Sequence, residues 1–255
     1  MILARSDDHP DTLQPALFRL PLELRQEIYS YLCPPEPLAY PIPSLNIISV
    51  SHQPPPAAVL VVNSWLTADI QAYYLHIATW KFIVSHAFNY YRVDPHLSNL
   101  ADSHIINQLQ KIELVLFFDG SLLRSYPSFG IEEMYDQVKS RATRFCQILA
   151  TAPDLEHVKV SWIDTTTGGG SYSSWEEKAS ILEPLALLKD KVTFSPGDME
   201  WPAAPDPVDF RFAVREILQD PPHARRSGHW IHAHAHSSSF QNIVPTVGAL
   251  SEVVV

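Results

Sequence analysis

Cysteine and glycine are scarce in this chain of 255 residues, which has two cysteines and eight glycines against 22 prolines. Cys33 and Cys146 lie far apart, and each flanks apolar positions of an expected helix. We therefore expect two buried, reduced thiols rather than a disulfide framework. The N-terminus is too acidic and too short in apolar residues for a signal peptide. Reduced thiols and the lack of a signal peptide together predict a cytoplasmic or nuclear location.

Positive charge and long apolar runs are also scarce. The chain has seven lysines and a formal net charge of −10. Nucleic-acid binding draws its affinity from a dense basic face that releases counterions, so we expect no nucleic-acid partner. No window of 18 apolar residues occurs, so we expect no membrane span. The hydrophobic fraction of 46% is ordinary, and predicts a globular chain long enough for one large domain or two small ones.

The motifs of common active sites are missing from the sequence. There is no Gly-x-Ser-x-Gly, His-Glu-x-x-His or Cys-x-x-Cys. The glycines at 168–170 have no following Lys-Ser/Thr, which favours a flexible loop over a phosphate loop. Asp119 follows an expected strand, where α/β proteins bind ligands, but Asp119-Gly120 is better interpreted as a turn. We therefore expect no enzyme activity and no cofactor.

One candidate for metal binding is a run of histidines near the C-terminus, His229, His232, His234 and His236. Three imidazoles on one side of an extended chain could bind zinc, nickel or copper. Catalytic metal sites draw their ligands from separate rigid elements and orient them through further hydrogen bonds, which a local run does not provide. We interpret the run as a solvated tail with adventitious metal affinity. A metal-dependent hydrolase that uses it is the less favoured alternative.

The most informative pattern is a short amphipathic helix expected over Phe18–Leu32. Pro21 suits a first helical position, and Pro34 and Pro35 prevent the helix from continuing. An apolar residue recurs every four positions, which predicts one apolar face: Leu20, Leu24, Ile28 and Leu32. A helix of about 12 residues is marginal alone, so this face is expected to dock on the chain itself or on another protein.

The sequence Leu-Pro-Leu-Glu-Leu-Arg-Gln-Glu-Ile-Tyr at residues 20–29 resembles the opening of an F-box. It is most similar to the F-box-like proteins abundant in filamentous fungi. Looser similarity extends to Ala68–Tyr74, Trp80–Val84 and Lys111–Phe117. An F-box continues at once with two further helices, whereas residues 33–56 carry eight prolines.

The resemblance implies a non-enzymatic substrate receptor that links a Skp-type adaptor to a protein target for ubiquitination by a cullin–RING ligase. The positions that match the adaptor-contact pattern are Leu20, Pro21, Leu24, Ile28 and Leu32. Two alternatives stay open: these side chains pack on the rest of the chain, or the protein is an F-box-like scaffold with no ligase role. A second and third helix that complete a three-helix unit would favour the receptor.

The rest of the chain alternates between strand and helix patterns. We expect strands at Trp80–Val84, Lys111–Phe118, His157–Ile163 and Lys191–Phe194. We expect helices at Ala57–Leu75, Ile131–Leu149, Ser174–Leu188, where Ser174–Glu177 is a capping box, and Asp206–Leu218. This alternation favours the α/β class, with a small, mostly parallel layer that resembles a leucine-rich repeat at Ala152–Val160; α+β is the alternative.

The composition suggests four parts of the chain. Residues 1–16 are expected to be a flexible N-terminus, and residues 17–56 the F-box-like helix with a Pro-rich connection. Residues 57–219 would form the α/β body. Residues 220–255 are rich in histidine and serine, and are expected to be a poorly ordered tail.

Overall fold

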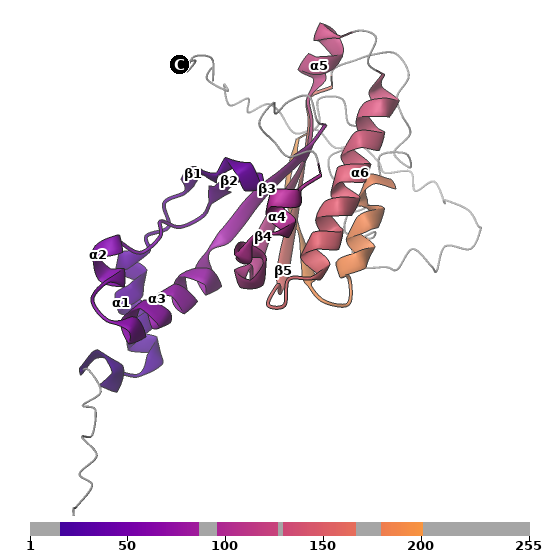
Figure 1. The fold of residues 1–255 in the computed structure, drawn as a ribbon. Helices are drawn as coiled ribbons and strands as arrows, with labels where there is room; N and C mark the ends of the chain where they lie inside the picture. The colour runs from indigo at the N-terminus through magenta and orange to yellow at the C-terminus, as the bar shows by residue number, and fades with distance from the viewer. Residues whose placement is uncertain (1–15, 87–95, 127–129, 167–179, 201–255) are drawn as a thin grey trace, which may run out of the picture. The chain divides into compact units, whose positions relative to one another are not determined.

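The computed structural model describes residues 16–86, 96–126, 130–166 and 180–200, and they form an α/β fold with a six-stranded sheet (Figure 1). The strands lie in the order β1-β2-β3-β4-β5-β6, so each pairs with its neighbours along the chain. All described residues belong to one compact unit, Met1–Pro222. A second unit, His223–Val255, lies outside the described ranges and contains the whole histidine run.

The N-terminal helix forms where the sequence predicts it. A short 3₁₀ turn, η1 (Ala16–Arg19), precedes α1 (Leu22–Leu32). Pro21 is the N-cap residue rather than the first helical residue, with an extended ψ of 152°. The helix ends at Cys33 because the residue before a proline is disfavoured in the α region.

The Pro-rich connection contains a β-hairpin that the sequence analysis did not predict. Strand β1 (Leu38–Ile42) pairs antiparallel with β2 (Ile47–Val50), and the 3₁₀ turn η2 (Pro43–Leu45) joins them. Pro41 is accommodated because β1 is the edge strand and its register with β2 is irregular between Ala39 and Ile42. Proline density here therefore marks an edge hairpin within the Pro-rich connection.

The single helix expected over Ala57–Leu75 is divided into α2 (Ala57–Leu60) and α3 (Ser64–Ile77). The side chain of Asn63 caps α3 by accepting a hydrogen bond from the Trp65 backbone N–H at 2.7 Å. Val62, which the expected helix would include, lies in the break between α2 and α3 and is 70% exposed.

Four parallel strands form the rest of the sheet. Strand β3 (Thr79–Ser85) pairs antiparallel with β2 and parallel with β4 (Lys111–Phe118), which pairs parallel with β5 (His157–Asp164). Strand β6 (Thr193–Glu200) pairs parallel with β5 and runs six residues beyond Phe194, where the expected strand ends. Its Pro196 is tolerated because β6 is the other edge of the sheet.

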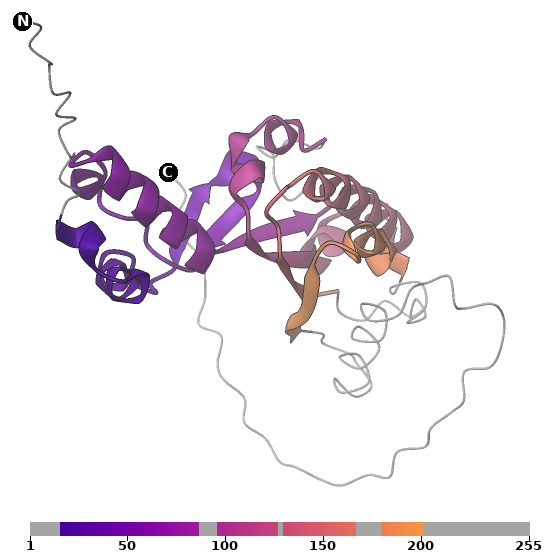
Figure 2. The ribbon, with the colours of Figure 1, turned by 90° about the horizontal axis from the view of Figure 1, so that it is seen from below.

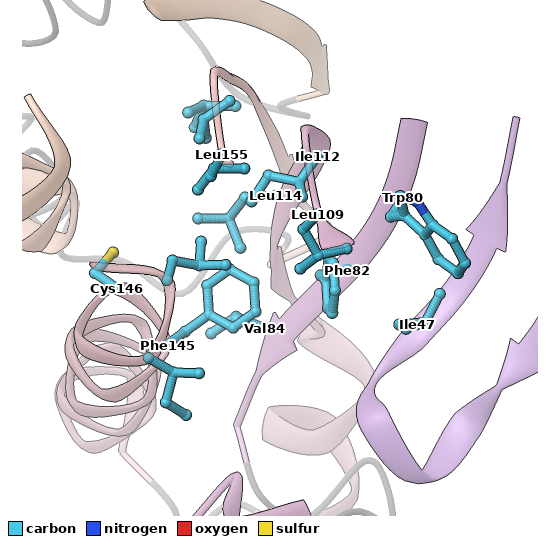
Figure 3. Close-up of a cluster of buried hydrophobic side chains, with 14 of the residues drawn as sticks. Ile47, Trp80, Phe82, Val84, Leu109, Ile112, Leu114, Phe145, Cys146 and Leu155 are labelled. Carbon is cyan, nitrogen blue, oxygen red and sulfur yellow. The ribbon is translucent and has the colours of Figure 1, made fainter. Parts of the chain in front are cut away.

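The helix α6 (Ile131–Ala150) covers one face of this sheet. Seven residues that recur at helical spacing form a buried stripe: Met134, Tyr135, Val138, Ala142, Phe145, Cys146 and Leu149. Figure 3 shows the contact, in which Phe145 of α6 meets Phe82 of β3 with ring centroids 5.1 Å apart. Both cysteines are free and buried, as expected. Burial raises the pKa of the Cys146 thiol to about 12.

The remaining described helices are short. They are α4 (Ser98–Ala101), η4 (His104–Gln108), α5 (Gly120–Ser125) and η5 (Ser180–Leu188). Figure 2 shows η5 beside α6 on the same side of the strands. The segment η5 ends at Leu188 as expected but is a 3₁₀ helix, with Pro184 inside it. None of the helices in the described ranges has the length and apolarity that crossing a bilayer requires.

Several sequence-based expectations fall on residues outside the described ranges. They are the glycine-rich loop at 168–170, the capping box at Ser174–Glu177, the helix at Asp206–Leu218 and the tail at 220–255. The interpretations of the glycines at 168–170 as a flexible loop and of the histidine run as a solvated tail therefore remain predictions from the sequence.

Candidate docking surface

The inner side of α1 packs on α3 through polar and aromatic side chains. Tyr29 is 1% exposed and donates a hydrogen bond from its hydroxyl to Asp69 Oδ2 of α3 at 2.7 Å. Arg25, one turn earlier on the same side of α1, forms an ion pair with the same carboxylate. Tyr29 also contacts the ring of Tyr73, with centroids 5.8 Å apart. One buried face of α1 is thus fixed to α3 by a shared carboxylate.

Aromatic contacts extend this attachment to the start of the helix. The guanidinium carbon of Arg25 lies 5.4 Å from the centre of the Phe18 ring, a cation–π geometry. Phe18 in turn meets Trp65 of α3 edge-on, with centroids 6.1 Å apart. Arg25 of the F-box-like motif is therefore held inside the chain, between a carboxylate and a ring.

The electrostatics of this contact keep the Tyr29 phenol protonated. Burial raises its pKa to about 12, and the adjacent Asp69 carboxylate acts in the same direction. Arg25 opposes both effects but does not cancel them. The phenol therefore stays a hydrogen-bond donor to Asp69 across the physiological pH range.

The outer side of α1 carries most of the aliphatic stripe that the sequence identified. Leu20, Leu24 and Ile28 are 37%, 52% and 40% exposed, and Tyr31 beside them is 78% exposed. Pro21 is also exposed. Only Leu32 of the five motif positions packs against the main core. We call Leu20, Leu24, Ile28 and Tyr31 the outer stripe.

Large exposed hydrophobic side chains gather in this N-terminal part. Of eleven such side chains in the described residues, nine lie between Leu20 and Trp65, and only Tyr126 and Leu187 lie elsewhere. Val61 and Val62, in the turn between α2 and α3, are 83% and 70% exposed. Single exposed apolar residues are normal, but their concentration in this part of the chain makes it the candidate docking surface.

Two further helices, α2 and α3, follow α1, but not directly as in an F-box. The Pro-rich residues 33–56 contain strands β1 and β2 and no α-helix. Helices α2 and α3 follow directly after Pro56, and α3 contacts both α1 and α2 (Figure 1). Three helices therefore associate, with a β-hairpin inserted between the first and the second.

The other candidate groups have ordinary structural roles. Asp119 accepts a hydrogen bond from the Ser121 backbone N–H at 2.8 Å, as a turn residue does. Within the described ranges, no three His, Cys, Asp or Glu side chains gather to hold a metal ion. Cys146 is buried and its pKa is high, so its thiol lacks the thiolate character of a nucleophile.

Sequence reasoning missed Asp69, the residue that decides which side of α1 is buried. One signal was available: Arg25 and Tyr29 are four residues apart and lie on one side of the helix, so both can reach a single acceptor. Nothing in the sequence indicates that the acceptor lies 40 residues downstream of Tyr29.

No family model matches the chain, and neither a curated protein nor a solved structure does.

Proposed function

We propose that the outer stripe of α1 binds a Skp-type adaptor, and that the chain is a non-enzymatic, F-box-type substrate receptor for ubiquitination. The observation that carries the proposal is the exposure of Leu24 and Ile28 on a helix whose opposite side is anchored to α3, together with exposed Leu20 two residues before the helix begins. These are positions where the F-box resemblance implies adaptor contact.

The energetics of the stripe favour a partner. Fully burying a leucine or isoleucine side chain contributes roughly 1.5–3 kcal/mol, and about half of that remains available for Leu24 and Ile28. The attachment of α1 to α3 orders the helix before binding, which lowers the entropy that association must overcome. A preformed apolar helix face is a common element of helix-in-groove recognition.

A second candidate function is an F-box-like scaffold that uses the same stripe for another protein and has no ligase role. The β-hairpin between α1 and α2 favours it, because an F-box continues directly from its first helix into two more. Both functions predict a binding stripe, and they differ in the identity of the partner.

The test is co-purification of the full chain with a fungal Skp-type adaptor. The proposal predicts a stoichiometric complex with the wild type that is lost in Leu24→Asp/Ile28→Asp. Leu187→Asp is a matched control, since Leu187 is 55% exposed but lies in η5.

Two results would contradict the receptor function. One is the absence of a complex with the folded wild type, which would favour the scaffold. The other is equal loss of binding in the Leu187→Asp control, which would mean that any added surface charge disrupts the complex.

A further inference from the structure

A row of charged side chains crosses the sheet on the face that points away from the main core. Lys81 of β3, Glu113 of β4 and Lys159 of β5 lie side by side, because the pairing registers align them. The next residue of each strand is buried in the main core with Phe145 of α6: Phe82, Leu114 and Val160. Successive strand residues point to opposite faces, so the charged row lies on the other face.

One carboxylate in this row is shared by two lysines. Lys81 Nζ lies 3.1 Å from Glu113 Oε1, and Lys159 Nζ lies 3.6 Å from Glu113 Oε2. The Ser161 hydroxyl donates a further hydrogen bond to Glu113 Oε1 at 2.7 Å, and accepts one from the Asp198 backbone N–H at 3.0 Å. The trio therefore has a net charge of +1.

The two lysines form the accessible rim of the row. The side chains of Lys81 and Lys159 are 29% and 35% exposed, whereas that of Glu113 is 10% exposed. Burial alone would raise the pKa of Glu113, but the Ser161 hydrogen bond and the two lysines outweigh it and lower that pKa. Glu113 is thus an anion that is largely buried beneath the two lysines, whose side chains are more exposed to solvent.

Two further basic residues share this face. By strand alternation Lys111 and His157 belong to the same face, where they are paired in register. Within β3, β4 and β5, Glu113 is the only carboxylate on this face; Glu200 of the edge strand β6 pairs in register with Ile163 and adds a second carboxylate at the opposite end of β5 from His157. Three of seven lysines thus share one sheet face in a chain of net charge −10. We call Lys81, Lys111 and Lys159 the basic row.

We infer that the basic row binds an acidic peptide segment of a partner protein. The carboxylates of such a segment would pair with Lys81 and Lys159, whose flexible stems can turn from Glu113 toward the ligand. Charge complementarity selects the ligand, because the strongly negative remainder of the chain repels acidic peptides from other surfaces. Assigning that segment to a ubiquitination target rests on the proposed function; the binding itself does not.

The experiment measures fluorescence anisotropy of a labelled oligoglutamate peptide with the full chain and no adaptor. We expect saturable binding that is lost at about 1 M salt, where the Debye length is about 3 Å. Lys81→Glu/Lys159→Glu is expected to weaken binding at least about tenfold, because close charge pairs at interfaces contribute 1.5 kcal/mol or more. Lys139→Glu/Lys189→Glu, which changes net charge equally but lies outside the sheet, should retain binding.

A second variant keeps the inference testable if the charge reversal fails to fold. Glu113→Gln frees both lysines from their anion and is expected to strengthen oligoglutamate binding. The inference is overturned if Glu113→Gln weakens binding, if wild type does not bind, or if the Lys139/Lys189 control loses as much affinity. It is also overturned if an oligonucleotide binds the same lysines as tightly. Leu24→Asp/Ile28→Asp should bind oligoglutamate normally, which separates this site from the adaptor proposal.

Discussion

Two adjacent residues of α1 have opposite roles, and their truncation to alanine tests the orientation of the helix. Ile28 lies in the outer stripe and is 40% exposed, whereas Tyr29 is 1% exposed against α3. Both substitutions place the best helix former at the same level of the same helix, so helix propensity does not separate them. Any difference in stability therefore reports the packing of the two side chains.

The expected magnitudes follow from burial. Ile28→Ala removes a side chain that is only partly buried, so the free energy of unfolding should fall by about 1 kcal/mol. Tyr29→Ala removes a fully buried ring, for which aromatic truncations cost about 3–5 kcal/mol. It also deprives Asp69 of the hydroxyl donor at 2.7 Å.

Urea unfolding followed by tryptophan fluorescence measures both changes, since the chain has six tryptophans. We expect a small decrease in the urea midpoint for Ile28→Ala and a several-fold larger one for Tyr29→Ala, at similar m-values. Equal losses would refute the reasoning, because they would mean that Ile28 is buried as deeply as Tyr29. The stripe would then be part of the core and unable to bind a partner.

Three further predictions concern other contacts. Asp69→Asn should destabilise the chain by about 1.5–3 kcal/mol, because it removes the charged partner of Arg25. It should also lower the pKa of Tyr29 from about 12, which ultraviolet titration of the phenol measures. The pKa of Glu113 is lower in the folded chain than its ordinary value of 4.5, so its stabilisation is present above pH 4.5 and is lost as pH falls through the folded pKa. Urea midpoints across this range should decline less steeply for Glu113→Gln. Gly120→Ala would place a Cβ 2.3 Å from a backbone carbonyl oxygen, so thermal unfolding should show a loss of about 1–3 kcal/mol in stability. Gly130→Ala, whose Cβ would have nothing within 4 Å, should lower stability by only about a few tenths of a kcal/mol.

The strongest sequence patterns predicted the elements that carry the α/β body. Strand β4 has a continuous apolar run, and α6 has a stripe that recurs over five turns, so local composition alone indicates both. The β1–β2 hairpin was missed because its prolines argue against a strand unless that strand is known to be an edge. Edge position is a property of the sheet order, which the sequence does not show.

The orientation of α1 illustrates a second limit. Its aliphatic residues share one face, and the usual expectation is that such a face is buried. The buried face instead contains Arg25 and Tyr29, because Asp69 supplies a charge-assisted partner from a helix some 40 residues away. Similarly, the row of Lys81, Glu113 and Lys159 exists only through strand register. Both features depend on long-range pairing that no local pattern indicates.

The most direct test of the docking surface is hydroxyl-radical footprinting of the full chain, alone and with an excess of Skp-type adaptor. In the chain alone, we expect Tyr31 to be oxidised at least as readily as Tyr126, and Leu24 and Ile28 about as readily as Leu187, where Tyr126 and Leu187 are exposed references of matching type outside α1. With the adaptor, the three stripe residues should be protected several-fold while the references stay unchanged. Stripe residues that are already protected in the chain alone, or that remain equally oxidised with the adaptor, would contradict the account.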